Sequence, residues 1–221
     1  MGYITGGIPK EIVTKIIEKE HPAAFVETGT YIGDTAMWAS AHFSKVYTIE
    51  IMAEMSQTAT KRAAGIKNIN FLVGDSSKVM PTIINELPDN AFFWLDGHYS
   101  GQGTGGEENE CPVLEEINIS SKCKDAIILI DDARCFYGPP PNPHNASHWP
   151  GIADIFDLLK QRFPNHYVTV VDDVIFSVPA RLKPILDNDW QEHFYTRFAG
   201  KKAPTYRRIL GGIKAKLLGK S

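Results

Sequence analysis

Acidic side chains stand at the ends of successive short apolar runs in this chain. They are Glu27, Glu50, Asp75, Asp96 and the pair Asp131-Asp132. Such runs are typical of buried β-strands, and the carboxyl ends of parallel strands share one sheet edge, where α/β proteins bind ligands. An acid there can also cap the next helix, which would explain Asp75. Glutamate is a poor N-cap, so Glu27 and Glu50 need another explanation. The pattern predicts a crevice lined with carboxylates.

Three of these carboxylates, on Asp96, Asp131 and Asp132, predict a divalent-cation site. Like charges held close together repel one another unless a cation joins them, and all-oxygen ligands favour Mg²⁺, Ca²⁺ or Mn²⁺ over zinc. Such an ion would bind a substrate hydroxyl and lower its pKa. A free histidine side chain has a pKa close to neutrality, so His98 is a candidate for the base that takes the proton. Alternatively, Asp132 caps a helix and Asp96 only orients a base.

The stretch from Phe25 to Thr35 reads as a strand, a glycine turn and a helix that begins near Tyr31 or Ile32. Its Glu-x-Gly-x-x-x-Gly spacing differs from the Gly-x-Gly-x-x-Gly of dinucleotide-binding turns. Gly29 and Gly33 let a ligand approach the backbone. A carboxylate at position 27 would repel a phosphate, so a cationic head, such as the amino group of S-adenosylmethionine, suits this turn better.

Two further positions are candidates for contacts to a nucleoside. Glu50, roughly 20 residues after the turn, is placed to accept hydrogen bonds from two ribose hydroxyls. Asp75 and Ser76 follow a third apolar run and are candidates for contacts to an adenine amino group, with helix capping as the alternative for Asp75.

Alternating strand and helix patterns predict an α/β fold. Apolar runs at 23–27, 45–50, 69–73, 91–95 and 126–130 alternate with helical patterns, after an opening helix at 9–20. This order predicts a doubly wound, mostly parallel sheet with helices on both faces. Runs at 166–171 and 174–178, joined by Asp172-Asp173, predict an antiparallel C-terminal hairpin, although its turn lacks the usual glycine.

Composition is that of a globular protein, with 43% hydrophobic and 22% charged residues among 221. We expect an N-terminal helical extension (1–22), one ligand-binding domain (23–180) and a C-terminal extension with a basic tail (181–221). A net charge of −3 argues against general nucleic-acid binding. The three cysteines have no disulfide or zinc spacing. Without a membrane span or signal peptide, we expect a cytoplasmic protein.

The basic tail leaves two interpretations open. Thr205–Leu218 carries Arg and Lys residues beside Ile and Leu residues. An amphipathic helix of this kind could contact a membrane surface or a protein partner, or it could be a terminal helix packed by its apolar face.

Together, these motifs resemble the class I S-adenosylmethionine-dependent methyltransferases, and within them the metal-dependent sugar O-methyltransferases of the macrocin and novobiocin type. The resemblance covers about residues 20 to 180. Its most specific parts are Asp96-Gly97-His98 and Asp131-Asp132. Related catechol-type enzymes place a lysine soon after the first metal aspartate, where this chain has His98 and Tyr99, so a catechol-type base is not carried over.

The resemblance implies a seven-stranded sheet and O-methyl transfer, assisted by Mg²⁺, to a hydroxyl of a sugar, glycan or glycosylated small molecule. It implies that the cofactor contacts Glu27, Thr28, Gly29, Thr30, Gly33, Glu50, Asp75, Ser76 and Asp96. It also implies that Asp96, Asp131 and Asp132 bind the metal and that Asp96 is a second candidate base. Homo-oligomerisation is left open. The rival interpretations are an oxidoreductase or epimerase with a nucleotide cofactor, and an inactive scaffold on the same fold.

Overall fold

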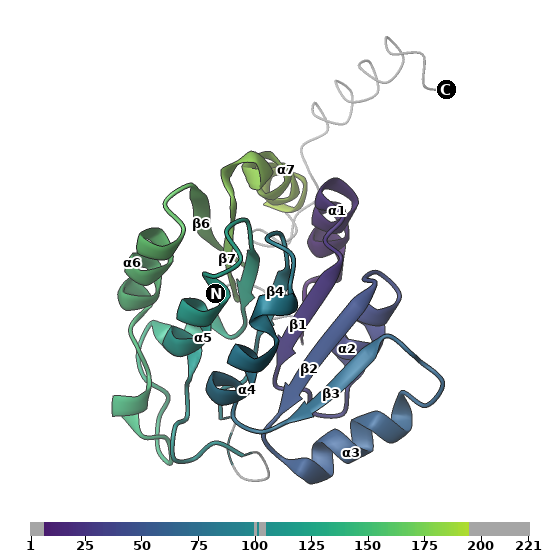
Figure 1. Cartoon of the computed structure of the whole chain (residues 1–221). Helices are drawn as coiled ribbons and strands as arrows, with labels where there is room; N and C mark the ends of the chain where they lie inside the picture. Colours follow the sequence, from purple (N-terminus) through teal and green to yellow (C-terminus); the bar gives the residue numbers. More distant parts are fainter. Residues whose placement is uncertain (1–6, 100, 102–104, 195–221) are drawn as a thin grey trace.

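The computed structural model of this chain describes residues 7–99, 101 and 105–194 (Figure 1). A seven-stranded sheet forms its centre, in the order β3-β2-β1-β4-β5-β7-β6. Its strands are β1 (Ala24–Thr28), β2 (Lys45–Glu50), β3 (Ile69–Val73), β4 (Phe92–Leu95), β5 (Ile127–Ile130), β6 (His166–Val171) and β7 (Val174–Pro179). Strands β1 to β5 pair in parallel, whereas β7 runs antiparallel to both β5 and β6. The predicted α/β fold with an antiparallel C-terminal hairpin is confirmed.

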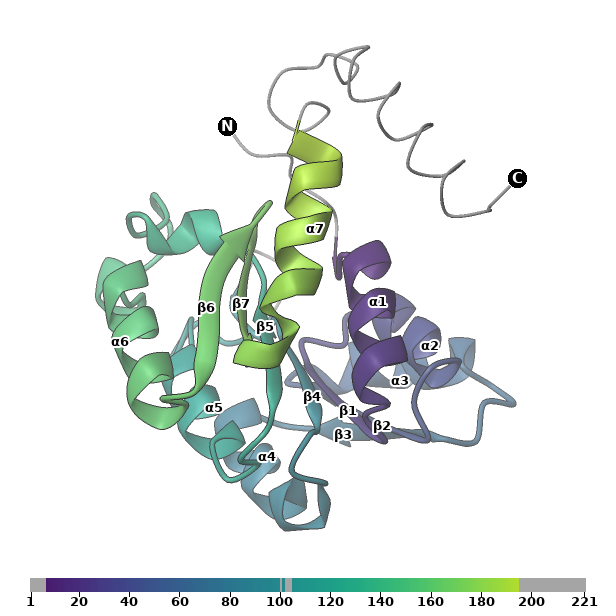
Figure 2. The ribbon, with the colours of Figure 1, turned by 90° about the horizontal axis from the view of Figure 1, so that it is seen from above.

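Helices cover both faces of the sheet (Figure 2). They are α1 (Lys10–Glu20), α2 (Asp34–Ser40), α3 (Ala53–Arg62), α4 (Ser76–Ile83), α5 (Val113–Ser120), α6 (Ile152–Arg162) and α7 (Lys183–Phe194), with short 3-10 turns at Ile84–Glu86, Ala133–Phe136, Ala146–His148 and Ala180–Leu182. Apolar residues of α4, α5 and α6 form one core with the sheet, and those of α1, α2 and α7 form the other. Burial of these two helix faces holds the strand ends in register.

The first helix is part of the main core. Ile12, Val13 and Ile16 are fully or almost fully buried, in the same cluster as Phe25 and Trp94 of the sheet. Fully burying each of these apolar side chains is worth about 1.5–3 kcal/mol. The stability of the sheet therefore depends on this helix.

Two local features differ from the sequence-based expectation, and the structure explains a third, the hairpin turn without glycine. Helix α2 begins at Asp34 rather than near residue 31, because Tyr31 and Gly33 both have positive φ and lengthen the turn. The hairpin turn has no glycine because Asp172 itself adopts the left-handed conformation, at φ 54°. Helix α7 was not predicted, since Pro184 and six charged or amide residues obscure its pattern.

The basic segment 205–218 lies outside the described residues, so neither interpretation of the tail is tested. Among the helices of residues 7–194 that are described, none is long and apolar enough to cross a membrane.

Candidate functional site

Hydrogen bonds continue past the strand ends and align the turns that follow. The backbone N–H of Gly29 donates to the Ile49 carbonyl oxygen at 2.9 Å, and that of Asp131 donates to the Leu95 carbonyl oxygen at 3.1 Å. The Asp96 N–H lies 3.2 Å from the Thr28 carbonyl oxygen and 3.1 Å from the Thr28 hydroxyl. The turns after β1, β4 and β5 therefore start at the same sheet edge.

The turn after β1 and the turn after β4 lie closest together at Gly29 and Asp96. Gly29 has φ +82°, and a Cβ built on it would overlap the backbone carbonyl of Asp96. Only glycine allows the turn after β1 to lie directly against Asp96, the residue that follows β4. The glycine turn and the acid are thus parts of one rigid unit.

We expect Gly29→Ala to lower the free energy of unfolding by about 2–5 kcal/mol, because it adds left-handed strain to a clash with backbone atoms. Urea denaturation measures the loss. Gly65→Ala is the matched control: its φ is +96°, but nothing lies within 4 Å of the added Cβ. A similar loss for both variants would show that strain alone, and not the contact with Asp96, fixes the glycine.

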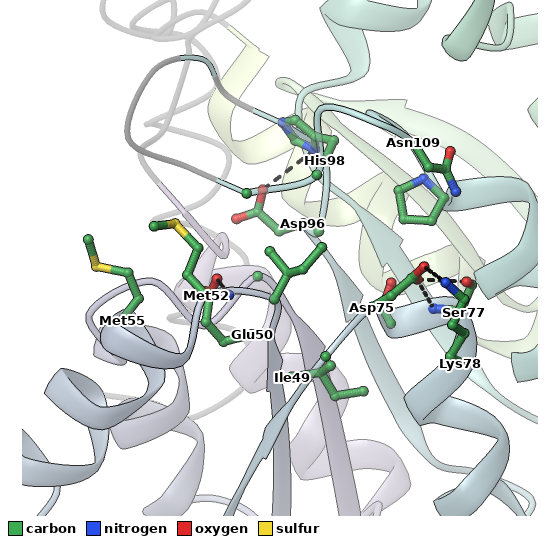
Figure 3. A pocket seen from close by; sticks show the side chains of 18 of the residues that line it. Ile49, Glu50, Met52, Met55, Asp75, Ser77, Lys78, Asp96, His98 and Asn109 are labelled. Atoms are coloured by element: carbon green, nitrogen blue, oxygen red, sulfur yellow. Dashed lines mark hydrogen bonds and ion pairs between the residues drawn. The ribbon is translucent and has the colours of Figure 1, made fainter.

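A pocket of about 1120 Å³ opens at this edge (Figure 3). Its walls are the segments that follow β1, β2, β3 and β4. The sequence-predicted residues that line it are Gly29, Glu50, Asp75, Ser76, Asp96 and His98. Ligand pockets commonly measure about 300–1,000 Å³, so this one has room for a cofactor and a second molecule.

Glu50 is held at the pocket by backbone donors. Its Oε2 accepts from the Tyr31 N–H at 2.8 Å, and its Oε1 accepts from the Met52 N–H at 3.0 Å. The side chain is buried but lines the pocket. Carboxylate oxygens have further lone pairs, so Glu50 can accept from ligand hydroxyls while it holds these two turns.

Asp75 caps helix α4 and also lines the pocket. It accepts from the Ser77 N–H at 2.9 Å and the Ser77 hydroxyl at 2.6 Å, and pairs with Lys78 at 3.2 Å. Burial alone would raise the pKa of Asp75, but these hydrogen bonds and the lysine charge outweigh it and hold the pKa below its usual value. Asp75 therefore caps the helix, as the alternative interpretation expected, and it also faces the pocket.

Glu27, Thr28 and Thr30 are buried and do not line the pocket. Glu27 Oε2 accepts from the Thr48 hydroxyl at 2.5 Å. Burial, with the nearby charges of Asp96 and Glu50, raises the pKa of Glu27 to about 8, despite hydrogen bonds from Thr48 and Thr35. Glu27 therefore supports the pocket floor from behind.

Gly33 is the N-terminal cap of α2. An added Cβ there would lie 3.0 Å from Ala59 of α3. This glycine lets two helices pack closely and is absent from the pocket lining.

His98 lies between two of the predicted metal ligands. Its Nε2 is 3.0 Å from Asp132 Oδ2, and its Nδ1 is 3.8 Å from Asp96 Oδ1. Burial would lower the pKa of His98, but the hydrogen bond to Asp132 and the charges of the three aspartates raise it overall. Burial raises the pKa of Asp96 to about 8, with His98 acting in the opposite sense. Asp96 and His98 both face the pocket (Figure 3).

The three aspartates do not form a ready cation cage. Arg134 Nη1 lies 2.6 Å from Asp132 Oδ1 and His98 Nε2 lies 3.0 Å from Asp132 Oδ2, so both oxygens of Asp132 already have side-chain partners. Asp131 Oδ1 accepts from the Asp132 N–H at 2.8 Å. Among the described residues, the one trio with ligand atoms all within 4.8 Å is Glu11, Asp189 and His193, which lies elsewhere. The residues in this arrangement do not fit a divalent ion.

Glu116 is a site neighbour that sequence reasoning missed. It belongs to α5, is 1% exposed, and its Oε1 has no hydrogen-bond partner. An added Cβ on Gly97 would lie 3.2 Å from this oxygen, which places the carboxyl directly beneath the Asp96-Gly97-His98 turn. Burial raises the pKa of Glu116 to about 7, although the hydroxyls of Ser76 and Thr28 oppose the shift. The sequence signal was a glutamate on the apolar face of a helix.

We expect Glu116 to make the protein less stable as the pH rises from about 4.5 to 7. The unfolded side chain loses its proton near pH 4.5, whereas the folded one keeps it to about pH 7. The full loss is roughly 3 kcal/mol. Glu116→Gln should remove this term, so its stability relative to the natural protein should rise between pH 5 and pH 8 in urea denaturation. Glu115→Gln, on the exposed face of α5, is the control. Parallel pH profiles for Glu116→Gln and the natural protein would contradict this assignment.

The segment 105–109 forms another part of the pocket wall. Glu107 and Glu108 line the pocket, and Glu107 accepts from the Tyr99 hydroxyl at 3.0 Å. A Cβ on Gly105 would lie 2.5 Å from Ile51 Cγ2. This glycine therefore lets the segment pack directly onto the residues after β2.

No family model and no curated protein matches this chain. Solved structures do. A proposed O-methyltransferase from Klebsiella pneumoniae matches with a TM-score of 0.59 and 11% identity, covering 80% of this chain and 83% of that one. A proposed caffeoyl-CoA O-methyltransferase from Staphylococcus aureus matches with a TM-score of 0.58 and 14% identity, covering 80% and 86%.

A proposed methyltransferase from Streptococcus mutans, solved in complex with SAH (S-adenosylhomocysteine), matches with a TM-score of 0.50 and 12% identity. The match covers 79% of this chain and 99% of that one. Identities this low establish the fold alone. This chain has the Rossmann-like fold of methyltransferases.

Proposed function

We propose that this protein transfers the methyl group of S-adenosylmethionine to a hydroxyl of a sugar or glycosylated small molecule. The observation that carries the proposal is the meeting of Glu50 and Asp96 in one pocket beside the Gly29 turn. The fold of methyltransferases, one of them solved with SAH, supports it. The nucleoside would lie across the turns after β1, β2 and β3, with its ribose at Glu50.

The reacting end of the pocket is the Asp96-Gly97-His98 turn. The acceptor oxygen attacks the methyl carbon in line, the S–CH₃ bond breaks as the O–CH₃ bond forms, and S-adenosylhomocysteine leaves. The hydroxyl proton passes to Asp96 or His98, the two titratable groups of this turn that face the pocket. When His98 takes the proton, the carboxylate of Asp132 beside His98 Nε2 stabilises the positive charge that forms on the ring.

The sequence analysis also expects Mg²⁺ to assist this reaction. A divalent ion at Asp96, Asp131 and Asp132 would lower the pKa of a bound hydroxyl, but both oxygens of Asp132 already have side-chain partners in His98 and Arg134. Titration of Mg²⁺ and of a chelator into a methyl-transfer assay distinguishes the two cases. Loss of activity with chelator that Mg²⁺ restores would establish metal assistance.

The charge of the lining favours a neutral or cationic acceptor. The acids Glu50, Asp75, Asp96, Glu107 and Glu108 line the pocket, against two described basic side chains, Lys78 and His98. S-adenosylmethionine carries one net positive charge and can offset only part of this excess. We expect a neutral glycoside to be methylated about 30 times more efficiently than its phosphate ester, because one like charge some 8 Å away costs roughly 2 kcal/mol at an effective dielectric of 20. Equal efficiency for the two would contradict this prediction.

Calorimetry tests the proposal directly. S-adenosylhomocysteine should bind and NAD should not, and a screen of sugar and phenol acceptors with labelled S-adenosylmethionine should then show methyl transfer. Preference for NAD would favour an oxidoreductase or epimerase. Cofactor binding without transfer to any hydroxyl acceptor would favour a scaffold.

A further inference from the structure

A buried acid lies behind the reacting turn and has no part in the proposed chemistry. Glu110 has a side chain that is 5% exposed, and it does not line the pocket. Its carboxylate accepts from Trp149 Nε1 at 2.7 Å and from the Asn145 N–H at 2.9 Å, and lies 3.2 Å from His144 Nδ1. A buried carboxylate with three such neighbours is held in one orientation.

All three neighbours belong to one short segment, 144–149, which ends the long connection between β5 and α6. Burial alone would raise the pKa of Glu110, but the contacts with Trp149, Asn145 and His144 outweigh it and keep the pKa below its usual value. Removing the carboxylate would leave the N–H of the buried Trp149 without an acceptor, which costs about 1–3 kcal/mol. Glu110 therefore fastens this segment to the body of the protein.

The segment in turn packs against the reacting turn. The ring of Trp149 meets the ring of His98 edge to face, with centroids 5.6 Å apart and an interplanar angle of 63°. The ring of His144 contacts the ring of Tyr99, the residue after His98, with centroids 5.5 Å apart. The Tyr99 N–H also donates to the Glu110 carbonyl oxygen at 2.7 Å.

Glu110 thus holds both sides of one contact. Its side chain holds Trp149, and its backbone holds the residue that follows His98. On its other side, His98 Nε2 meets Asp132 at 3.0 Å. The imidazole is confined between Trp149 and Asp132, and its orientation toward the pocket depends on both.

We propose that Glu110 is a positioning residue that sets the orientation of His98 by fastening Trp149 behind it. The inference rests on the proposed function only in giving His98 a place at the reacting end. The contact itself can be tested without any acceptor.

The test is nuclear magnetic resonance of protein labelled at its histidine rings, with the His98 signals assigned from a His98→Asn variant. The ring current of Trp149 makes these signals sensitive to the distance between the two rings. We expect Glu110→Ala to shift them. Trp149→Phe should shift them too, because it removes both the indole ring beside His98 and the N–H that donates to Glu110. The double variant should match Trp149→Phe alone, because Glu110 acts through Trp149. Glu115→Gln, an exposed glutamate of α5, should leave them unchanged.

Binding and turnover separate positioning from general damage. Calorimetric affinity for S-adenosylhomocysteine should stay within about threefold, or roughly 0.7 kcal/mol. Once a methyl acceptor is identified, the kcat of Glu110→Ala should fall by about 10- to 100-fold while its KM for S-adenosylmethionine stays constant. A small displacement of a reacting group causes a loss of this size. Glu110→Gln, which keeps one acceptor oxygen, should recover part of it and also serves if the alanine variant does not fold.

His98 signals that stay in place in a folded Glu110 variant would overturn the inference, as would fully additive effects of the two substitutions. Failure of the natural protein to bind S-adenosylhomocysteine would instead count against the proposed function, and would leave the contact between Glu110, Trp149 and His98 to be judged by its own signals.

Discussion

Asp96→Asn should lower the rate of methyl transfer by about 10²–10⁴-fold, the usual contribution of a positioned general base. Asp96 directly follows β4, faces the pocket and lies 3.8 Å from His98. Asparagine keeps the shape of the side chain but cannot take a proton. The measurement is kcat with saturating S-adenosylmethionine and a responsive sugar acceptor.

Cofactor affinity is the companion measurement for Asp96→Asn. Calorimetric binding of S-adenosylhomocysteine should change by only about threefold, or roughly 0.7 kcal/mol. Asp157→Asn, an exposed aspartate on α6, is the matched control and should behave as the natural protein. If His98 alone is the base, Asp96→Asn will keep most of its turnover and His98→Asn will not, and the assignment of Asp96 fails.

Glu50→Ala should weaken binding of S-adenosylhomocysteine by about 100-fold or more. Hydrogen bonds to a charged acceptor are worth about 1.5–3 kcal/mol each, so two ribose hydroxyls account for roughly 3–6 kcal/mol. The substitution also frees the backbone N–H groups of Tyr31 and Met52, which Glu50 holds at 2.8 and 3.0 Å. Isothermal calorimetry measures the change in Kd.

The matched control for Glu50 is Glu54→Ala, an exposed glutamate four residues later on α3. It removes the same charge from the same region without touching the pocket, and its affinity should match that of the natural protein. Adenosine should lose as much affinity for Glu50→Ala as S-adenosylhomocysteine does. A loss confined to the amino-acid part of the ligand would place the ribose elsewhere.

Much of the fold could be predicted because local patterns and tertiary structure agree. Strands β2, β3 and β6 have the predicted bounds, since each is a β-branched or aromatic run that packs in the sheet. Helix α7 could not be predicted, because Leu186 and Asp189 are the only buried residues in its described range, Lys183–Phe194, and its pattern of apolar residues is therefore weak. Its place depends on packing near α1, which no local sequence rule contains.

The residues of the site can likewise be divided into those that the sequence predicts and those that it does not. Strand-end acids can be found from sequence, and Glu50, Asp75 and Asp96 do meet in one pocket. Which acids face a ligand depends on the pleat and on the turn that follows, so Glu27 being buried behind the pocket could not be foreseen. Glu110 and Glu116 were missed because their partners lie on other segments, at Trp149 and beneath Gly97.

The order of the strands separates the segments that form the pocket walls from the connection that lies behind His98. Among the described residues, the pocket lining comes from the end of β2 and from the connections after β1 to β4, and the connection after β5 contributes none of it. Asp132 and Trp149 of that connection contact His98 instead. Under the proposed function, residues 137–143 can therefore vary between related proteins without altering the walls around the nucleoside, provided that Trp149 keeps its place against His98.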